Sequence, residues 1–310
     1  MVTFLFNLLK EARPRQWIKN FALLGGLLFS GQLSNQVAII DSIFAFLIFC
    51  AASSATYILN DIFDVERDRL HPFKNKRPIA AGKISIPVAT ILALSIYVLI
   101  LPLSYKLSPA FFLAVLLYLI LQLLYSSYLK SVILLDVMTI AAGFVLRVYA
   151  GIWAIDAHLN VWFLLTVISF SLFLAIGKRR SELTLLQAQA SKHRETLLHY
   201  PENLLDILTA MFANATWLAY AFFTFLQPPI YARPRLIGIF SELDLPFTQA
   251  KYLMATIPIV IYGVMRYLYI IYEKKEGESP ERVLLTDKPI LFTVILYTLL
   301  TIGIIYFLGS

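Results

Sequence analysis

Long apolar runs alternate with short charged segments along the whole chain. Nine runs approach or reach the roughly 17 to 25 residues that a helix needs to cross a bilayer. They lie at residues 18–33, 37–59, 86–104, 109–126, 132–155, 161–177, 204–226, 252–272 and 290–308. Because the runs are of helix length and lack the two-residue alternation of barrel strands, they predict an all-α polytopic membrane bundle of nine transmembrane helices.

The composition supports this class of protein. Hydrophobic residues make up 59% of the 310 residues, and the mean hydropathy is +0.75. We therefore expect one integral-membrane domain over residues 1–310. Residues 1–17 combine apolar positions such as Phe4 and Leu8 with polar ones such as Lys10, Glu11 and Arg13, which predicts an amphipathic segment at the membrane interface.

The positions of lysine and arginine indicate how the chain is oriented. Most of the 26 lie in the N-terminal segment, at Lys130, and in three loops at 61–85, 178–203 and 273–289, all on one side of a nine-span bundle. Positively charged short loops stay in the cytoplasm. We expect a multi-pass protein of the inner (plasma) membrane with a cytoplasmic N-terminus, an outer C-terminus and cytoplasmic active-site loops. The net charge of +7 is then a signal of topology and not of nucleic-acid binding.

Four polar residues at the end of the second run form the sharpest motif. Asn60, Asp61, Asp64 and Asp68 occur at helical spacing, so that the three aspartates share one face. Three carboxylates on one face repel one another and need a counter-charge, which a hard cation with oxygen ligands supplies. The motif predicts a Mg²⁺ site, the alternative being a solvated helix end.

Basic residues follow the aspartates directly. Two prolines and Gly82 interrupt the helix here, which favours a structured loop that returns Lys74 and Arg77 toward metal-bound phosphates. A basic loop that only sets the topology is the bland alternative.

The fifth run contains an arginine inside a predicted span. Such a guanidinium is costly unless it is paired or faces a polar cavity, so Arg147 is a functional candidate. Asp136, Gly143 and Arg147 lie along one stripe of that helix, with Lys130 just before it. An internal pair between Asp136 and an arginine of another helix is the alternative.

The sixth run ends in a basic cluster. Lys178, Arg179 and Arg180 precede Glu182, and the predicted loop continues to Arg194. These cations could form a second anion site or anchor the chain to anionic lipid.

At these residues the sequence resembles the UbiA superfamily of intramembrane prenyltransferases, nine-helix bundles with an NDxxDxxxD motif on the second helix. The resemblance covers the whole chain. Within the superfamily, the sequence is most similar to the decaprenyl-phosphate phosphoribosyltransferase subgroup, through residues 13–20, 60–82, 125–136, 177–182 and 279–289.

One departure from ordinary prenyltransferases supports that subgroup. Those enzymes usually carry a second aspartate-rich motif after the sixth helix, where this chain has Lys178, Arg179, Arg180 and Glu182. The resemblance implies a donor with phosphates at both ends, 5-phosphoribosyl 1-diphosphate, and a polyprenyl phosphate as acceptor. The product would serve the synthesis of envelope arabinan.

The resemblance also implies roles for individual residues. Mg²⁺ would be held by Asn60, Asp61, Asp64 and Asp68; donor phosphates by Lys74, Arg77, Lys178 and Arg179; and the lipid phosphate by Lys130 and Arg147. Asp61, Asp64, Asp68 and Asp136 are the expected catalytic residues, and Arg15, Lys19, Tyr125, Glu182 and Arg194 complete the expected substrate contacts.

Two other functions stay open. A prenyltransferase acting on an aromatic or other small acceptor would use a prenyl diphosphate as donor. A lipid or small-molecule transporter would use Arg147 and Asp136 as pathway charges, although the inverted repeats typical of transporters are not evident. The proline-containing loop at 227–250 leaves room for contact in a homo-oligomer.

Overall fold

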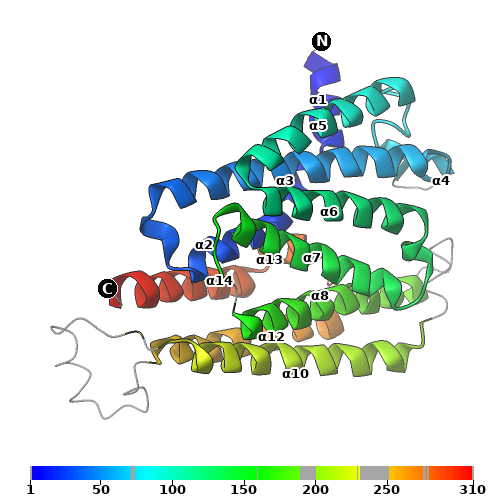
Figure 1. Ribbon diagram of the computed structural model, residues 1–310. Helices are drawn as coiled ribbons and strands as arrows, with labels where there is room; N and C mark the ends of the chain where they lie inside the picture. Colours follow the sequence, from blue (N-terminus) through cyan, green and yellow to red (C-terminus); the bar gives the residue numbers. More distant parts are fainter. Residues whose placement is uncertain are drawn as a thin grey trace, which may run out of the picture. The chain divides into compact units, whose positions relative to one another are not determined.

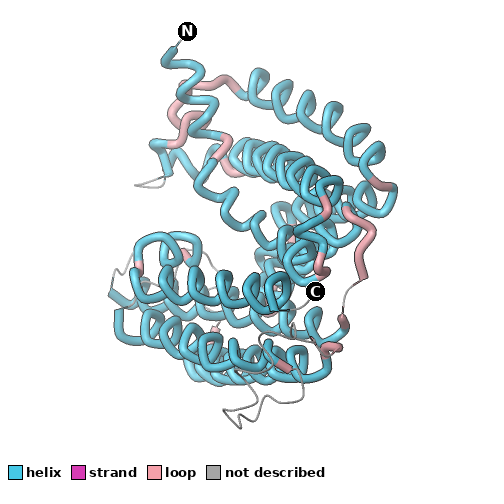
Figure 2. Tube along the Cα trace, turned by 90° about the vertical axis from the view of Figure 1, so that its left-hand side faces the viewer, coloured by secondary structure: helices cyan, strands magenta, loops and turns pink. Residues whose placement is uncertain are grey.

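The structure is a computed structural model that describes residues 2–70, 74–158, 160–188, 200–228, 230, 251–274, 277 and 279–308. Every regular element within these ranges is a helix, as Figure 2 shows. The prediction of an all-α fold is confirmed.

Eight helical stretches of the described chain are long and apolar enough to cross a membrane. Six of them are the single helices α3 (Gln36–Phe63), α5 (Ile86–Leu107), α6 (Pro109–Ser127), α7 (Leu135–Ala154), α8 (Val161–Ala188) and α10 (Glu202–Leu226) (Figure 1). The seventh, Tyr252–Lys274, is the 3₁₀ turn η5 (Tyr252–Thr256), α12 (Ile257–Tyr269) and the π-helical turn η6 (Ile270–Lys274). The eighth joins α14 (Lys288–Ile302) to the π-helical η7 (Gly303–Leu308). The second to ninth predicted spans correspond to these stretches.

The first predicted span has a different form. Residues 14–29 are the 3₁₀ helix η1 (Pro14–Leu24) and the short α2 (Gly25–Phe29), and no α-helix of spanning length forms there. The segment runs antiparallel along α3. Trp17 Nε1 donates to Ser54 Oγ at 2.9 Å, and the Phe21 ring lies 5.0 Å from that of Phe46. A 3₁₀ helix rises about 2.0 Å per residue, against roughly 1.5 Å for an α-helix, so this segment covers more of α3 in this form.

The chain folds into two compact units. The first unit comprises Met1–Leu27, Asn35–Lys130 and Leu146–Ala157, and the second comprises Leu28–Ser34, Ser131–Val145 and His158–Ser310. Helix α7 therefore begins in the second unit and ends in the first. Each unit has its own apolar core, built around Ile58 and Ile79 in the first and around Phe173, Tyr267 and Ile271 in the second.

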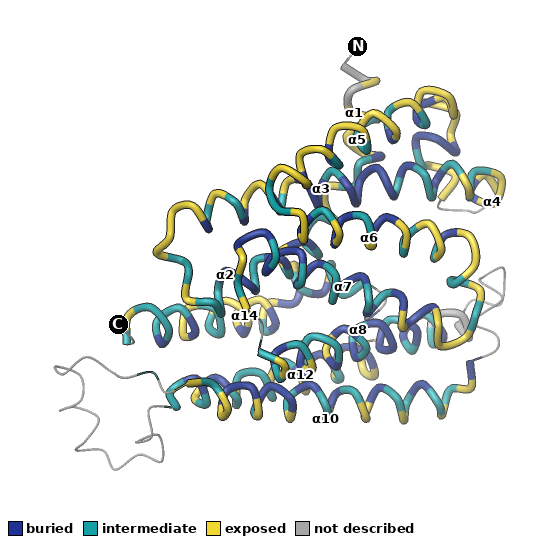
Figure 3. Tube along the Cα trace, in the orientation of Figure 1, coloured by how far each residue is buried: buried dark blue, intermediate teal, exposed yellow. Residues whose placement is uncertain are grey.

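Some helices leave large apolar side chains uncovered. Within its most apolar stretch, α5 is only 17% buried, and Ile91, Val98 and Leu99 are more than half exposed (Figure 3). An apolar face of this size has to be covered by lipid or by another protein surface. The outward face of α5 is the face expected of a helix in a bilayer.

The polar segments after α3 and within α8 are more helical than predicted. Helix α8 continues to Ala188, so the expectation of a loop from residue 178 is wrong, and Lys178 to Glu182 lie on a helix. Here the side chains of Arg179 and Glu182 form an i, i+3 pair that stabilises the added turns. After α3, the short helices α4 (Val65–Leu70) and η3 (Lys74–Lys76) occupy part of the predicted 61–85 loop, and α13 (Pro280–Thr286) part of the 273–289 loop.

Two glycines bring the η1–α2 segment against α7 within the first unit. A Cβ added at Gly151 would collide with the backbone carbonyl of Leu23, and one at Gly26 would lie 2.7 Å from Ile152 Cγ1. Small residues of this kind let membrane helices approach backbone to backbone. The close approach explains why an irregular segment can pack tightly in this position.

We expect Gly151→Ala to lower the thermal unfolding midpoint of the detergent-purified protein by several degrees. The added methyl group must displace the Leu23 backbone, and overpacking of this kind costs about 1–3 kcal/mol. Gly263→Ala is the matched control, because its Cβ meets only Thr293 Cγ2 at 3.5 Å, an ordinary contact. Equal midpoints for Gly151→Ala and the wild type would contradict the close approach.

Candidate active site

The aspartate motif lies at the junction of α3 and α4, in the first unit. Asp64 ends α3, yet the helical hydrogen bonds continue through it, from Asp64 N to Asn60 O at 3.0 Å and from Asp68 N to Asp64 O at 2.8 Å. The helical spacing expected from the sequence is therefore kept. Asp61 and Asp68 are 2% and 3% exposed, whereas Asp64 is more open.

Three basic side chains neutralise these aspartates. Arg13 Nη2 donates to both Asp61 oxygens at 2.5 Å, and Arg77 Nη1 bridges Asp61 at 2.9 Å and Asp68 at 2.5 Å. Lys130 Nζ contacts Asp64 at 3.0 and 3.2 Å. Residues from distant parts of the chain thus meet at one end of α3, and the predicted return of Arg77 to the motif agrees with the structure.

Arg13 is a site residue that the sequence analysis did not single out. It stands between α1 (Val2–Glu11) and η1 in a left-handed conformation, with φ 51° and ψ 59°. Non-glycine residues held there cost on the order of 1–3 kcal/mol and occur often at functional sites. Arg15, which was expected to contact substrate, is exposed, and Arg13 takes the place beside Asp61. Its occurrence in the Arg-Pro-Arg segment of the resemblance was the available signal.

Glu11 was also missed. It is 2% exposed, and neither of its carboxylate oxygens has a hydrogen-bond partner among the described residues. Burial and the neighbouring Asp61 raise the pKa of Glu11 to about 8, while Arg13 and Arg77 act in the opposite direction. Two ionised carboxylates cannot hydrogen-bond, so only a protonated Glu11 could donate to Asp61. The sequence pattern gave Glu11 a place on the polar face of an interfacial helix.

The donor set of this region suits a divalent cation in its chemistry. Carboxylate and amide oxygens are the ligands that Mg²⁺ prefers, and Glu11 offers a buried carboxylate with no hydrogen-bond partner among the described residues. In the part of the chain that the structure describes, no three His, Cys, Asp or Glu side chains are arranged to hold an ion, because each aspartate is engaged by a base. The metal assignment of Asn60, Asp61, Asp64 and Asp68 remains a prediction.

Arg147 lies in a buried polar cluster of the first unit. Its Nε donates to Asn20 Oδ1 at 2.8 Å, and its Nη2 donates to the Tyr118 hydroxyl at 3.0 Å. Asn20 also donates to Ser53 Oγ at 3.2 Å. The cluster links η1, α3, α6 and α7, so Arg147 has an evident packing role beside its predicted contact with the lipid phosphate.

The second unit contains a different charged group. Arg179, 1% exposed, donates through Nε to Asp136 at 2.6 Å and through Nη1 to Glu182 at 2.5 Å. The Tyr200 hydroxyl donates to the other Asp136 oxygen at 2.6 Å, and burial together with that carboxylate raises the pKa of the phenol. This is the internal Asp136–arginine pair that the sequence left open. Because both side chains are buried and bonded, the geometry favours a structural role over phosphate binding by Arg179 or catalysis by Asp136.

The other expected substrate contacts differ in burial. Lys74 is exposed, Lys19 and Tyr125 are half-buried, and Lys178 pairs with Glu182 at 3.8 Å. Arg194 lies outside the described residues. The structure brings the aspartate motif, Arg77 and Lys130 together.

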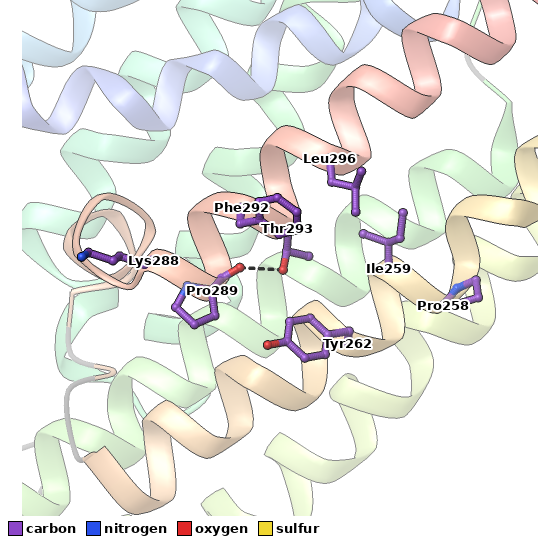
Figure 4. A pocket seen from close by; sticks show the side chains of 8 residues that line it. All are labelled: Pro258, Ile259, Tyr262, Lys288, Pro289, Phe292, Thr293 and Leu296. Atoms are coloured by element: carbon purple, nitrogen blue, oxygen red, sulfur yellow. Dashed lines mark hydrogen bonds between the residues drawn. The ribbon is translucent and has the colours of Figure 1, made fainter.

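An apolar groove lies between α12 and α14 in the second unit. Ile259, Tyr262, Phe292 and Leu296 line it, with Lys288 at one end (Figure 4). None of its lining residues carries a carboxylate, and none was expected at the site. Lys288 is the one charged residue among those that line the groove.

Asp136→Asn should destabilise the protein through Arg179, which would stay buried after losing one of its carboxylates. Breaking a buried ion pair from one side costs on the order of 3 kcal/mol, so the thermal midpoint should fall clearly. Asp206→Asn is the matched control. Asp206 of α10 pairs with Arg180, the neighbour of Arg179 on α8, but the Asp206 side chain is 38% exposed. Such exposed pairs contribute less than about 1 kcal/mol. An unchanged midpoint with a lost activity would instead restore the catalytic role of Asp136.

Curated relatives match nearly the whole chain. Proteins named decaprenyl-phosphate phosphoribosyltransferase from Corynebacterium glutamicum and Mycolicibacterium smegmatis are 34% and 35% identical over 91% of this chain, and the matches cover 81% and 87% of those proteins. The protein of that name from Mycobacterium tuberculosis is 31% identical, again over 91% of this chain and 88% of its own length. These names agree with the subgroup that the sequence resembles.

Solved structures match in fold. A UbiA homolog from Archaeoglobus fulgidus, described as bound to DMAPP and Mg²⁺, superposes with a TM-score of 0.69 over 96% of this chain and 99% of its own, at 19% identity. The sequence model of the UbiA prenyltransferase family matches residues 21–232. The expectation of a membrane-embedded enzyme is confirmed on these grounds: the chain belongs to the UbiA prenyltransferase family.

Proposed function

We propose that this protein transfers the 5-phosphoribosyl group of 5-phosphoribosyl 1-diphosphate to a polyprenyl phosphate, of the decaprenyl type, and releases diphosphate. The observation that carries the proposal is the interleaving of three aspartates with Arg13, Arg77 and Lys130 at one end of α3. A site for a metal-bound diphosphate needs both kinds of group. The relatives, which match over 91% of the chain, are named for phosphoribosyl transfer to decaprenyl phosphate and support this reaction class.

Asn60, Asp61, Asp64 and Asp68 would hold Mg²⁺, which would offset the negative charge that develops on the departing diphosphate. The Archaeoglobus homolog, which shares this fold and is described with Mg²⁺ bound, supports the use of a divalent cation. The acidic motif abuts the apolar α3, so the cation would lie at the border between membrane and water.

Arg13, Arg77 and Lys130 would receive the phosphates. Guanidinium groups bind the non-bridging oxygens of a phosphate through two parallel hydrogen bonds, and lysine acts as a point charge. In the structure these side chains are hydrogen-bonded to the aspartates, which keeps them close to the position where the donor phosphates would bind. Exchange of carboxylate for phosphate partners would then couple binding of the cation to binding of the donor.

The bond changes balance without a protein nucleophile. The bond between the ribose C1 and the diphosphate oxygen breaks, and the diphosphate leaves with the electron pair. An oxygen of the lipid phosphate forms the new bond to C1. A phosphate monoester is already anionic near neutral pH, so no side chain has to remove a proton, which is consistent with Asp136 serving the packing of the second unit.

The distribution of charges supports one orientation in the membrane. The basic segments that flank the aspartate motif favour a cytoplasmic site at the inner (plasma) membrane, where the water-soluble donor is available. The η1 segment runs from Arg13 beside Asp61 to Phe21 beside Phe46, antiparallel to α3. We infer that this segment acts as the ninth crossing, which keeps the N-terminus on the cytoplasmic side and the C-terminus outside. A product of this kind would supply arabinose-containing envelope polymers.

The first test is diphosphate release by the purified protein with Mg²⁺ and a polyprenyl phosphate. We expect release with 5-phosphoribosyl 1-diphosphate, together with a phosphoribosyl lipid detected by mass spectrometry. A prenyl diphosphate with an aromatic acceptor should give none. Release only with the second pair would replace the proposal by prenyl transfer, and no substrate-dependent release with either would leave a transporter as the remaining candidate.

Asp64→Ala should lower kcat/KM by about 10²-fold or more, the loss typical when one preorganised charge stabiliser is removed. Asp64 is the most accessible of the three aspartates, so its replacement disturbs the packing least. Glu66→Gln is the control, because Glu66 stands in the same segment but is exposed. Normal Mg²⁺-dependent turnover by Asp64→Ala would remove the metal assignment.

A further inference from the structure

The N-terminal helix α1 places one acid at the aspartate motif. Glu11, its last residue, is buried with Asn7, whereas Phe6 and Leu9 of the same helix are 65% and 57% exposed. The helix thus turns Asn7 and Glu11 inward and Phe6 and Leu9 outward. Leu8 packs against the core around Ile58 and Ile79, which fixes this rotation.

Contacts on both sides of Glu11 hold it in place. Lys10 Nζ approaches the Lys76 carbonyl at 3.4 Å, and Ser54 Oγ donates to the Ala12 carbonyl at 2.8 Å. Arg13 then turns into the left-handed region and binds Asp61. The corner between α1 and η1 is therefore hydrogen-bonded to α3 and to η3, which restrains Glu11 from moving out to solvent.

The Glu11 carboxylate needs a partner at this position. A buried carboxylate that makes no hydrogen bond is costly, and such groups in native proteins have a partner. Asp61 and Asp68 already share Arg13 and Arg77, and neither guanidinium is hydrogen-bonded to Glu11. A cation is the partner that satisfies both oxygens of Glu11.

We propose that Glu11 is a ligand of the divalent cation at the aspartate motif, supplied by α1, and that binding of the cation locks α1 onto the end of α3. This inference rests on the metal site of the proposed function. It makes the N-terminal segment part of the active site, so that the site is complete only when α1 is docked. Binding of the cation would thereby stabilise the docked conformation of residues 2–13.

Manganese binding tests the proposal without turnover. Mn²⁺ is titrated into the purified full-length protein in detergent, and free Mn²⁺ is measured by electron paramagnetic resonance. Glu11→Gln keeps the shape of the side chain and removes its charge, and Glu66→Gln makes the same change at an exposed position. We expect the Kd for Mn²⁺ to rise about 10-fold or more in Glu11→Gln, the range found when a metal site loses a supporting group, and to stay within about twofold in Glu66→Gln.

Asp64→Asn separates this inference from the proposed function. Weakened binding in Asp64→Asn with wild-type binding in Glu11→Gln would overturn the role of Glu11 and leave the metal site standing. Wild-type binding in both variants would overturn the metal site and the Glu11 inference with it. An equal loss in Glu11→Gln and Glu66→Gln would reduce the effect to general charge and also overturn the proposal.

Hydrogen exchange of the wild-type protein gives a second readout that needs no variant. Mn²⁺ should slow amide exchange in residues 2–11, because cation binding would hold α1 against α3. Exchange in α10, which lies in the second unit, is the internal reference and should not change. Unchanged exchange in residues 2–11 at saturating Mn²⁺ would contradict the locking of α1.

Discussion

The cost of burying charge is the constraint on which the rest of this structure depends. Asp61, Asp68, Asp136 and Arg179 are each at most 3% exposed, and every one of them meets at least one opposite charge within 3 Å. An isolated charge would not persist at that depth. The helices are consequently tied together at their polar ends, where residues far apart in the chain have to meet to satisfy one another.

The two charged groups answer this constraint differently. In the second unit, both carboxylate oxygens of Asp136 are hydrogen-bonded, one by Arg179 and the other by Tyr200. In the first unit the charged groups are not all satisfied. Asp64 is partly exposed, and Glu11 has no hydrogen-bond partner among the described residues. A group that is incompletely satisfied is one that a ligand can complete. This difference is why the proposed chemistry belongs at the α3–α4 junction.

The packing of the η1–α2 segment also bears on the position of the charged groups. Gly26 and Gly151 let the η1–α2 segment and α7 approach backbone to backbone, and the buried cluster of Asn20, Arg147 and Tyr118 ties η1 to α6 and α7. Arg13 lies immediately before η1, so the packing of this segment decides where its guanidinium points. The close backbone contact at Gly26 and Gly151 is thus linked, through η1, to the position of the Arg13 guanidinium beside the aspartates.

Local pattern was enough to determine several properties from the sequence alone. Runs of apolar residues identify membrane helices because an unpaired backbone cannot cross lipid, and i, i+3, i+7 spacing places three aspartates on one face because a helix repeats about every 3.6 residues. Only the tertiary structure decided the partners: Arg13 and Glu11 at the aspartates, Arg179 for Asp136, and a 3₁₀ helix in place of a regular first span. These depend on which surfaces of distant segments meet. A glutamate at the end of an amphipathic helix has the same local pattern whether it faces water or a second carboxylate, and the packing around it makes the difference.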